Sequence, residues 1–597
     1  METRYRSLTA SEIEQLERSG NSAENWSAVK VTDQFSVSCL HGNCFDGEVR
    51  LGAIASGKVK DGDLTLREGI YNSSLANVTV GDHPAIHNVH MLSNYTLGDN
   101  VLLFNIDEMT CTADAKEVAW LEPMNENGGR RILPFSGMTI GDAYMWARYR
   151  GRKRFMERLE QMTYDTLGTA EGGYGRIGDC CVIKNTKTLH NVSVRSKADD
   201  PSRIEGCIVL SDGIVGYGCT VEHGVIAVRF LLGEHVHLEF GLRLNDTVVG
   251  DNSTLARCEV GNSILFPAHE QHHNNSFLIA GLIMGQSNIA AGGTIGSNHN
   301  SRTADNEIAA GRGFWPGLCC SFKHSSRFAS YCLLAKADYP AELDIKLPFA
   351  LVNNNASKDQ LEVMPAYWWM YNMYAMDRNS KKFAKRDKRV VKAQNIEFDN
   401  LAPDTAEEIL HGMELLRGWM KAAGDGPVYA DGMEKGKRRT VILKAKEGLK
   451  AYEDMLVFYA MKYLDGSSDN LSTYQPINAS NDWVNIGGQL VAKPDMERLI
   501  ADVENGKLGS WEAVHARFNA LWADYPAVKQ DHAYGVLCRL AGVEKLDDSL
   551  WQQYQQRYAD IQNYIEEQKV VSRHKDDVNP YRNMTYWDDV ERATVLD

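Results

Sequence analysis

Cysteine is scarce in this sequence, and its spacing forms no recognisable framework. The 597 residues include 12 cysteines, which are scattered apart from the adjacent pairs Cys180-Cys181 and Cys319-Cys320. No CxxC pair occurs, and neighbouring cysteines rarely bridge to each other, so the pattern does not indicate a disulfide-stapled fold. We therefore expect a reducing compartment, the cytoplasm.

Long apolar runs and an excess of positive charge are also lacking. No apolar run of about 18 residues is present, and the N-terminus lacks the apolar stretch that export requires, so we expect neither a membrane span nor secretion. The 64 Lys and Arg are outnumbered by 79 Asp and Glu, which gives a net charge of -15. Nucleic acids and anionic lipids are bound through clustered positive charge, and we expect neither as a partner. The densest basic run, from Lys381 to Arg389, is typical of a solvated helix face.

What the sequence does contain is a repeat. Five pairs, each opened by an apolar residue, begin at a constant spacing of 17: Val215-Gly216, Leu232-Gly233, Val249-Gly250, Phe266-Pro267 and Ile283-Met284. A second apolar position follows six residues later, with His272 as the exception, and a third follows after six more. Seventeen residues are too few for a βαβ crossover, which needs roughly 30. The period therefore predicts three short strands per coil, stacked as a parallel β-helix with one aliphatic column inside.

A β-sandwich with regular strands is the alternative, but a sandwich seldom keeps one spacing through five units. The same pattern occurs earlier, where Val80-Gly81-Asp82 and Leu97-Gly98-Asp99 are again 17 residues apart. We expect an N-terminal helix and lead-in, opened by a capping box at Thr9 and Glu12, to precede the coils. The coils themselves are expected to be interrupted by an insertion.

The remaining segments have helical periodicity. Within the insertion, apolar residues between Thr139 and Thr166 suit an amphipathic helix. The C-terminal part is predicted to be an all-α domain, in which the run from Asp404 to Glu408 places a capping residue and first-turn acids before a helix. The predicted organisation is a lead-in over 1–34, β-helix over 35–109, largely helical insertion over 110–175, β-helix over 176–361 and α-helical domain over 362–597.

These coils resemble the left-handed parallel β-helix of the hexapeptide-repeat superfamily of bacterial acyltransferases and sugar-nucleotide enzymes, over roughly residues 40 to 350. The run from Ile295 to Arg302, with Trp315-Pro316-Gly317 and Leu347-Pro348-Phe349, is similar to an uncharacterised family of such proteins with a helical C-terminal domain, found mainly in Bacteroidetes and spirochaetes. The resemblance implies a left-handed coil, acyl-CoA or sugar nucleotides bound in clefts between coils, and homotrimers. A Gly-rich nucleotide loop ahead of the coils, which a nucleotidyltransferase would carry, is absent from the sequence.

Histidine is concentrated on the coils. A spacing of 17 predicts that His235, Asn252, His269 and Gln286 stack on one face, and that His237, Thr254, Gln271 and Asn288 stack on another. A histidine in a cleft between coils could remove a proton from an acceptor hydroxyl or amine, because imidazole titrates near neutral pH. The candidate bases are His269, His273 and His299. Solvation of the outer wall is the simpler interpretation for any one of these residues.

A cluster of cationic and amide side chains follows the last regular coil. Arg offers a planar fork to phosphate or carboxylate oxygens, so the following residues are predicted to bind an anionic substrate: Asn298, Arg302, Arg312, Lys323 and Arg327. A polar loop without a ligand would have the same composition. The substrate is expected to be a sugar, a nucleotide sugar or acyl-CoA as co-substrate, and the cofactor stays unassigned.

Two other classes of function fit the same residues. Histidines at 269, 272 and 273, or at 87 and 90, could bind a metal as in the carbonic anhydrases of the superfamily, although the sequence assigns no metal ligand. Alternatively, the protein is a non-catalytic ligand-binding or assembly scaffold, in which the aromatic run Tyr367–Tyr374 forms an interface or packs against the β-helix.

Overall fold

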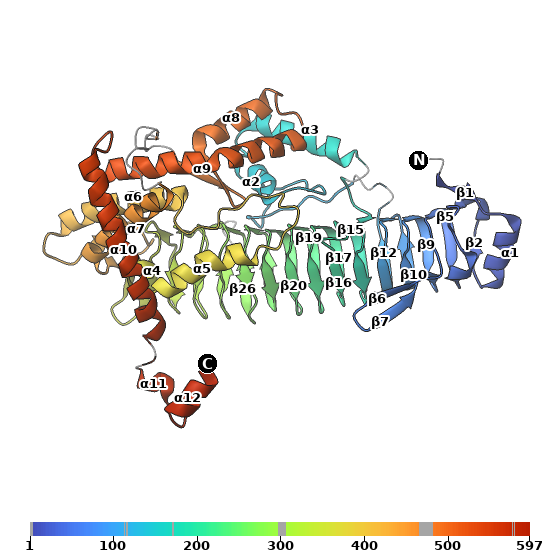
Figure 1. The fold of residues 1–597 in the computed structure, drawn as a ribbon, viewed down its shortest axis with the longest axis horizontal. Coiled ribbons are helices and arrows are strands. Elements are labelled where there is room, and N and C mark those ends of the chain that lie inside the picture. The colour runs from blue at the N-terminus through green and yellow to red at the C-terminus, as the bar shows by residue number, and fades with distance from the viewer. Residues whose placement is uncertain are drawn as a thin grey trace.

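The coils form a parallel β-solenoid. The computed structural model describes residues 4–112, 114, 117–169, 172–296, 306–464, 474, 482–575, 577 and 579–596. Its parallel stack begins at β2 (Ser22–Ala23), earlier than the predicted residue 35, and ends at β36 (Leu351–Asn355). Figure 1 shows the strands side by side along a rod. The predicted parallel coil with a helical C-terminal region is thus confirmed, and the coil's left-handed sense stays a prediction.

The register explains why a period of 17 was visible in the sequence. Ile86 pairs with Leu103, and Val221 pairs with Leu238 one coil further on. All four side chains are fully buried. Burying an aliphatic side chain of this size contributes roughly 1.5–3 kcal/mol, so the inward column supplies much of the stability of the solenoid.

Short parallel strands follow one another along three walls, except that β1 adds antiparallel to β3 and that β6 and β7 form a separate antiparallel hairpin. In the N-terminal part they are β1 (Arg6–Ser7), β3 (Val29–Val31), β4 (Leu40–His41), β5 (Cys44–Leu51), β6 (Lys58–Asp61), β7 (Leu64–Arg67), β8 (Gly69–Tyr71), β9 (Ser74–Val80), β10 (Ala85–Ser93), β11 (Thr96–Leu97) and β12 (Leu102–Thr110). After the insertion they are β13 (Arg176–Ile177), β14 (Val182–Lys184), β15 (Thr188–Val194), β16 (Arg203–Glu205), β17 (Val209–Val215), β18 (Thr220–Glu222), β19 (Ile226–Leu232), β20 (His237–Glu239), β21 (Arg243–Val249), β22 (Thr254–Ala256), β23 (Cys258–Gly261) and β24 (Ile264–Leu265).

The last coils contain β25 (Glu270–Gln271), β26 (Ser276–Ile279), β27 (Gly281–Ile283), β28 (Thr294–Gly296), β29 (Ile308–Ala310), β30 (Trp315–Pro316), β31 (Ser321–Lys323), β32 (Arg327–Phe328), β33 (Leu333–Leu334), β34 (Asp338–Tyr339) and β35 (Asp344–Ile345). The stack then passes into the C-terminal region through β37 (Gln360–Met364), β38 (Tyr429–Ala430) and β39 (Thr440–Ile442), while β40 (Trp483–Ile486) and β41 (Gln489–Ala492) form a hairpin. The C-terminal region is therefore helical but not all-α.

Helices form in the regions predicted to be helical, but the single helix expected between Thr139 and Thr166 is divided into two. The Thr9 capping box opens α1 (Ala10–Arg18), and a second capping box at Thr139 opens α2 (Ile140–Arg148), which α3 (Lys153–Leu167) follows in the insertion. The others are α4 (Tyr367–Tyr371), α5 (Met373–Arg386), α6 (Pro403–Ala423), α7 (Ala445–Tyr463), α8 (Lys493–Glu504), α9 (Trp511–Ala541), α10 (Asp548–His574), α11 (Pro580–Asn583) and α12 (Asp589–Leu596).

The helical region lies along one side of the solenoid. Figure 1 shows α2, α3, α8 and α9 above the rod, and α10 crossing its end. The insertion packs on the wall through Tyr144 of α2, whose ring centre lies 5.6 Å from that of Phe266. It also packs on the C-terminal region, because α3 contacts α8. Two segments far apart in the chain thereby cover the same wall.

Candidate functional site

One corner of the solenoid is covered by the segment between α5 and α6, residues 387–402, which we call the strap. Along this corner the amide of Lys392 donates to Glu234 at 3.0 Å, and the side chain of Gln286 donates to the carbonyl of Glu397 at 2.8 Å. Beyond the strap, Glu408 of α6 accepts from the amide of Ser330 at 2.9 Å. Contacts on several coils thus attach the helical region to the solenoid.

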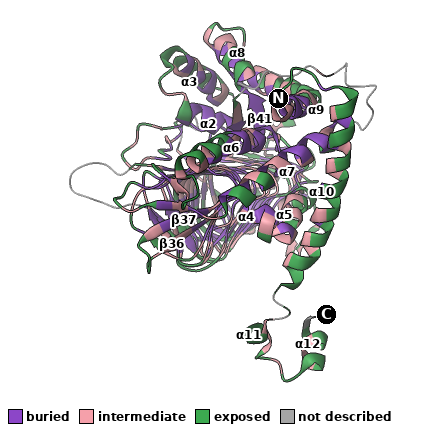
Figure 2. Cartoon of the chain, turned by 90° about the vertical axis from the view of Figure 1, so that its left-hand side faces the viewer, coloured by how far each residue is buried: buried purple, intermediate pink, exposed green. Residues whose placement is uncertain are grey.

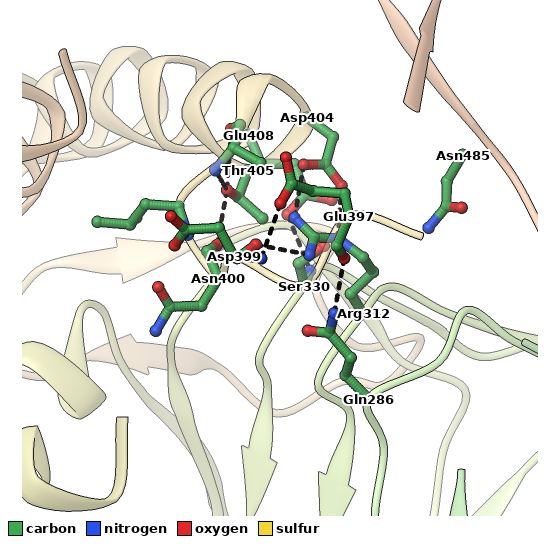
Figure 3. Close-up of polar contacts among 12 residues, drawn as sticks. Gln286, Arg312, Ser330, Glu397, Asp399, Asn400, Asp404, Thr405, Glu408 and Asn485 are labelled. Atoms are coloured by element: carbon green, nitrogen blue, oxygen red, sulfur yellow. Dashed lines mark hydrogen bonds and ion pairs between the residues drawn. The ribbon is translucent and has the colours of Figure 1, made fainter. Parts of the chain in front are cut away.

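Arg312 lies at the centre of this attachment, as Figure 3 shows. Its side chain is 2% exposed and donates to both oxygens of Asp404, at 2.8 and 2.7 Å, and to the carbonyl of Asp399 at 2.8 Å. A buried guanidinium needs such a bidentate partner to offset its lost hydration. Asp404 was predicted to help cap α6, but Ala402 is the N-cap residue and Asp404 instead neutralises Arg312. The guanidinium predicted to bind substrate is therefore engaged inside the protein.

Carboxylates surround Arg312 in unequal environments. Burial, with the nearby charge of Asp404, raises the pKa of Glu408 to about 7. Burial would also raise the pKa of Asp399, but the ammonium groups of Lys462 and Lys529 lower it below its usual value. Perturbed carboxyl groups are typical of active sites but also of structural ion networks. Here the groups are satisfied by the protein itself, so we interpret the network as structural.

A second buried cluster lies further along the same corner. Arg389 of the strap donates to Asp251 at 2.6 Å and to Asp387 at 2.8 Å. Burial and the charge of Asp251 raise the pKa of Glu234 to about 7. The adjoining cavity, which Gln394 also lines, has a volume of about 30 Å³. It has room for a single water molecule rather than a substrate.

The predicted stacking of His269 on His235 and Asn252 is wrong by one residue. The coil that joins Leu255 to Gln271 has 16 residues rather than 17, and the next one compensates, because Ile264 pairs with Leu282 at a spacing of 18. Gln271 therefore replaces the inward aliphatic residue, whereas His272 is 39% exposed and pairs with Glu270 at 3.2 Å. The second predicted ladder shifts in the same way, since Glu270 stacks on Thr254.

His269 consequently lies inside the solenoid. Its ring nitrogens bond Ser287 at 2.8 Å and Gln271 at 3.1 Å, and its exposed fraction is 0%. Burial lowers the pKa of His269 to about 4, so the ring is neutral at pH 7. It has no access to a substrate, and the geometry supports a structural role in satisfying buried polar groups.

The other predicted site residues are spread over the surface. His273 is exposed at the turn after β25, and its ring centre lies 4.6 Å from that of His272. Lys323 is half-buried on β31, while Arg327 is exposed and pairs with Asp344 at 2.8 Å. Asn298, His299 and Arg302 lie outside the described residues. The predicted anion site is thus not assembled among the residues that the structure describes.

An open groove lies on the solenoid wall near His273. It has a volume of about 620 Å³ and is lined by Phe240, Gly241, Arg243, Arg257, Cys258, Glu259, Asn274, Asn275, Ser276 and Phe277. The guanidinium of Arg257 lies 4.7 Å from the centre of the Phe240 ring. Within the described part of the chain, neither Arg257 nor Arg243 forms an ion pair. Two guanidinium groups without an ion-pair partner among the described residues therefore line an open groove.

Sequence reasoning missed this groove, although a signal was present. His223, Phe240, Arg257 and Asn275 all have positive φ and occupy one corner of successive coils, at spacings of 17, 17 and 18. Asn and Gly are the residues that usually adopt this conformation. Phe and Arg are unusual residues at such a corner. The period that predicted the coils could therefore also have identified Phe240 and Arg257 as neighbours on one face.

Metal ligands are not gathered in the described residues, where no group of three or more His, Cys, Asp and Glu side chains could hold an ion. His87 instead stacks on Tyr71 with ring centres 4.4 Å apart, and His90 lies 3.6 Å from Asp107. Among the described helices, none is both long and apolar enough to cross a membrane.

Comparison with known proteins places the chain in a family without a known function. Residues 5–420 match the family described as "Domain of unknown function (DUF4954)", and residues 468–569 match "Domain of unknown function (DUF6819)". An "Uncharacterized protein" of Treponema pallidum (strain Nichols) is 42% identical over 651 residues, which cover 99% of this chain and 90% of that protein. The predicted resemblance to an uncharacterised family is thus confirmed in this coarse form. The chain belongs to the DUF4954 family.

Proposed function

We propose that the groove at Arg243 and Arg257 binds a phosphorylated sugar or a nucleotide sugar. The observation that carries this proposal is the pair of guanidinium groups without ion-pair partners in the described residues, on the wall of a chain whose net charge is -15. Positive side chains on an acidic protein usually have carboxylate neighbours. Glu259 is the strand partner of Arg243 in this groove, yet among the described residues neither guanidinium forms an ion pair, which favours an anionic ligand.

The stacking of Arg257 on Phe240 fixes the orientation of its charged guanidinium group. A guanidinium that lies over a ring face keeps its N–H groups directed outward in its own plane. His223 stacks on the other face of Phe240, with ring centres 5.1 Å apart and an angle of 17° between the planes. The three stacked groups hold one another in place. Arg257 is thereby pre-organised for a planar pair of phosphate oxygens.

The remaining lining residues suit the rest of such a ligand. Glu259 accepts hydrogen bonds, Asn274 and Asn275 both donate and accept, and Phe277 offers an apolar face. Sugar hydroxyl groups need acceptors as well as donors. The combination therefore fits a phosphorylated sugar better than it fits inorganic phosphate alone.

For a transferase reaction in this groove, His273 is the proposed general base. In acyl transfer a substrate amine attacks the thioester carbonyl of an acyl-CoA, a base removes the amine proton, and CoA leaves as the thiol after taking up a proton. His273 is exposed and directly precedes Asn274, which lines the groove. His269 is not proposed for it, because it is enclosed in the solenoid.

Isothermal titration of the full chain with a nucleoside diphosphate sugar, CoA and inorganic phosphate tests the binding step. Arg243→Ala and Arg257→Ala should each weaken binding by about tenfold, the loss expected for one charge-assisted hydrogen bond. Arg50→Ala is the matched control, because Arg50 is a half-exposed arginine on the distant strand β5. Equal affinities in all four proteins would refute the proposal.

Turnover of acyl-CoA with amino sugars tests the chemical step separately. His273→Ala should lower kcat by about 100-fold or more while ligand affinity stays unchanged. Binding that depends on the arginines without any turnover would instead support the non-catalytic, ligand-binding alternative. The two experiments thus distinguish an enzyme from a scaffold.

A further inference from the structure

The C-terminal tail, residues 579–596, exposes large apolar side chains. Tyr581 is 82% exposed, Met584 72%, Trp587 93% and Val590 74%. Figure 2 shows α11 and α12 apart from the body of the protein. Single exposed apolar residues are normal, but a contiguous set led by a tryptophan marks an interaction site.

Charge gives the tail a preference among partners. Three acids follow the tryptophan closely, at Asp588, Asp589 and Glu591, whereas the nearest bases are Arg582 and Arg592. A complementary surface would therefore combine an apolar hollow with a basic border.

Such a hollow lies on the helical region. A cavity of about 480 Å³ is enclosed by α4, α5, α7, α10 and the strap, and its walls include Trp369, Met373, Met376, Phe458 and Ile565. This volume is within the range of about 300–1,000 Å³ that takes a compact ligand, and so it has room for an indole and a neighbouring methionine. Methionine-lined walls adapt to irregular shapes.

The cavity is lined by charges of both signs, Asp377, Lys381, Asp399 and Lys462, and the excess of positive charge belongs to the helix beside it. Helix α5, which forms one wall, contains five basic residues and one acid within 14 residues. Lys381 pairs with that acid, Asp377, at 2.8 Å, while Lys382 and Arg386 lie near Glu270. Arg378 and Lys385 are exposed. The basic run of the sequence is thus next to the apolar cavity.

We propose that this cavity receives the C-terminal tail of a second copy of the chain, with Trp587 and Met584 inserted and the following acids facing α5. Helix α10 reaches α5 near its end, because the amide of Tyr374 donates to Ser572 at 3.0 Å. The tail therefore leaves the body beside the cavity-bearing helix. Two copies related by a two-fold axis can exchange their tails there, as an isologous interface requires.

Reciprocal exchange also provides enough contact area. Each aromatic side chain buries roughly 150–250 Å², so Trp587 and Tyr581 of two tails account for at least about half of the roughly 1,200 Å² that a specific interface needs. Met584, Val590 and Val595 add to this. The dimer is expected to form in a concentration-dependent and salt-sensitive way.

Sedimentation velocity of the full chain, from about 1 µM to about 100 µM, measures the dissociation constant of this dimer. Trp587→Ala removes the inserted group without touching the body, and Met376→Trp fills the cavity. Each should raise the dissociation constant at least about tenfold. Phe240→Ala, which removes another exposed aromatic side chain, should leave it unchanged. Circular dichroism checks that the variants are folded.

Three results would overturn the proposal: a wild-type chain that is monomeric throughout, a dimer that both variants preserve, or a trimer that persists in Trp587→Ala. Docking of the tail in its own chain can be distinguished from exchange between two copies. In that case the wild-type protein is a monomer, and the melting temperature of Trp587→Ala is lower than that of wild type. Mixing the two variants should restore dimers with one occupied cavity, because each supplies the part that the other lacks.

Discussion

Replacing Glu408 by Gln should change how the stability of this protein depends on pH. Glu408 is enclosed where α6 meets the solenoid, and its pKa is raised from 4.5 to about 7 by burial and by Asp404. A carboxyl group with a raised pKa binds its proton more tightly in the folded chain than in the unfolded chain. The contribution of Glu408 to the free energy of unfolding is therefore at its maximum below pH 4.5, and it is lost as the pH rises through 7.

The size of this effect follows from the shift. One pKa unit corresponds to 1.36 kcal/mol, so the free energy of unfolding should fall by about 2 to 3 kcal/mol between pH 5 and pH 8 on account of Glu408 alone. Gln resembles the protonated carboxyl group and can still accept from the amide of Ser330, but it never ionises. Glu408→Gln should gain stability relative to wild type by this amount over the same interval.

Denaturant unfolding followed by tryptophan fluorescence at several pH values measures the difference. Glu414→Gln is the matched control, because Glu414 lies on the same helix and its side chain is 71% exposed. Its difference from wild type should stay flat with pH. Parallel profiles for Glu408→Gln and wild type would refute the assignment of a neutral, buried carboxyl group at this position.

Two further predictions concern buried polar groups. His269→Ala leaves Gln271 and Ser287 without their partner and should cost about 1 to 3 kcal/mol of unfolding free energy, with no change in ligand affinity; a variant as stable as wild type would contradict the interior placement. Arg312→Met leaves the carboxylate of Asp404 uncompensated and should cost about 3 to 5 kcal/mol, part of which Asp404→Asn in the same chain should recover. Additive losses in that double variant, measured by denaturant unfolding, would show that the two residues are not coupled.

The repeat made the architecture predictable, and its failure in one coil has a physical cause. The sequence places two large apolar residues side by side at Leu265 and Phe266, and the period alone favours Phe266 as the inward one. Leu265 instead pairs with Val249 in the inward column. Phe266 is equally buried because Tyr144 of the insertion covers it from outside. A pattern within one segment cannot reveal burial that a distant segment provides.

The candidate sites were predictable to different degrees. The groove combines Phe240 and Arg257 at equivalent positions of neighbouring coils, so the period that located the coils also relates these residues. Arg312 and Asp404 are 92 residues apart, and nothing in the repeat relates them. Their pairing depends on how the strap runs back along the corner, which only the tertiary structure determines.

The strap also implies an order of events during synthesis. It rests on coils that are made long before it, and Glu234 and Asp251 stay open to water until Arg389 and Lys392 arrive. A nascent rod would carry these carboxylates ionised and hydrated, so closing the strap over them must take up protons or supply cations. A chain that stops before residue 387 would therefore leave Glu234 and Asp251 as an exposed acidic edge on the rod.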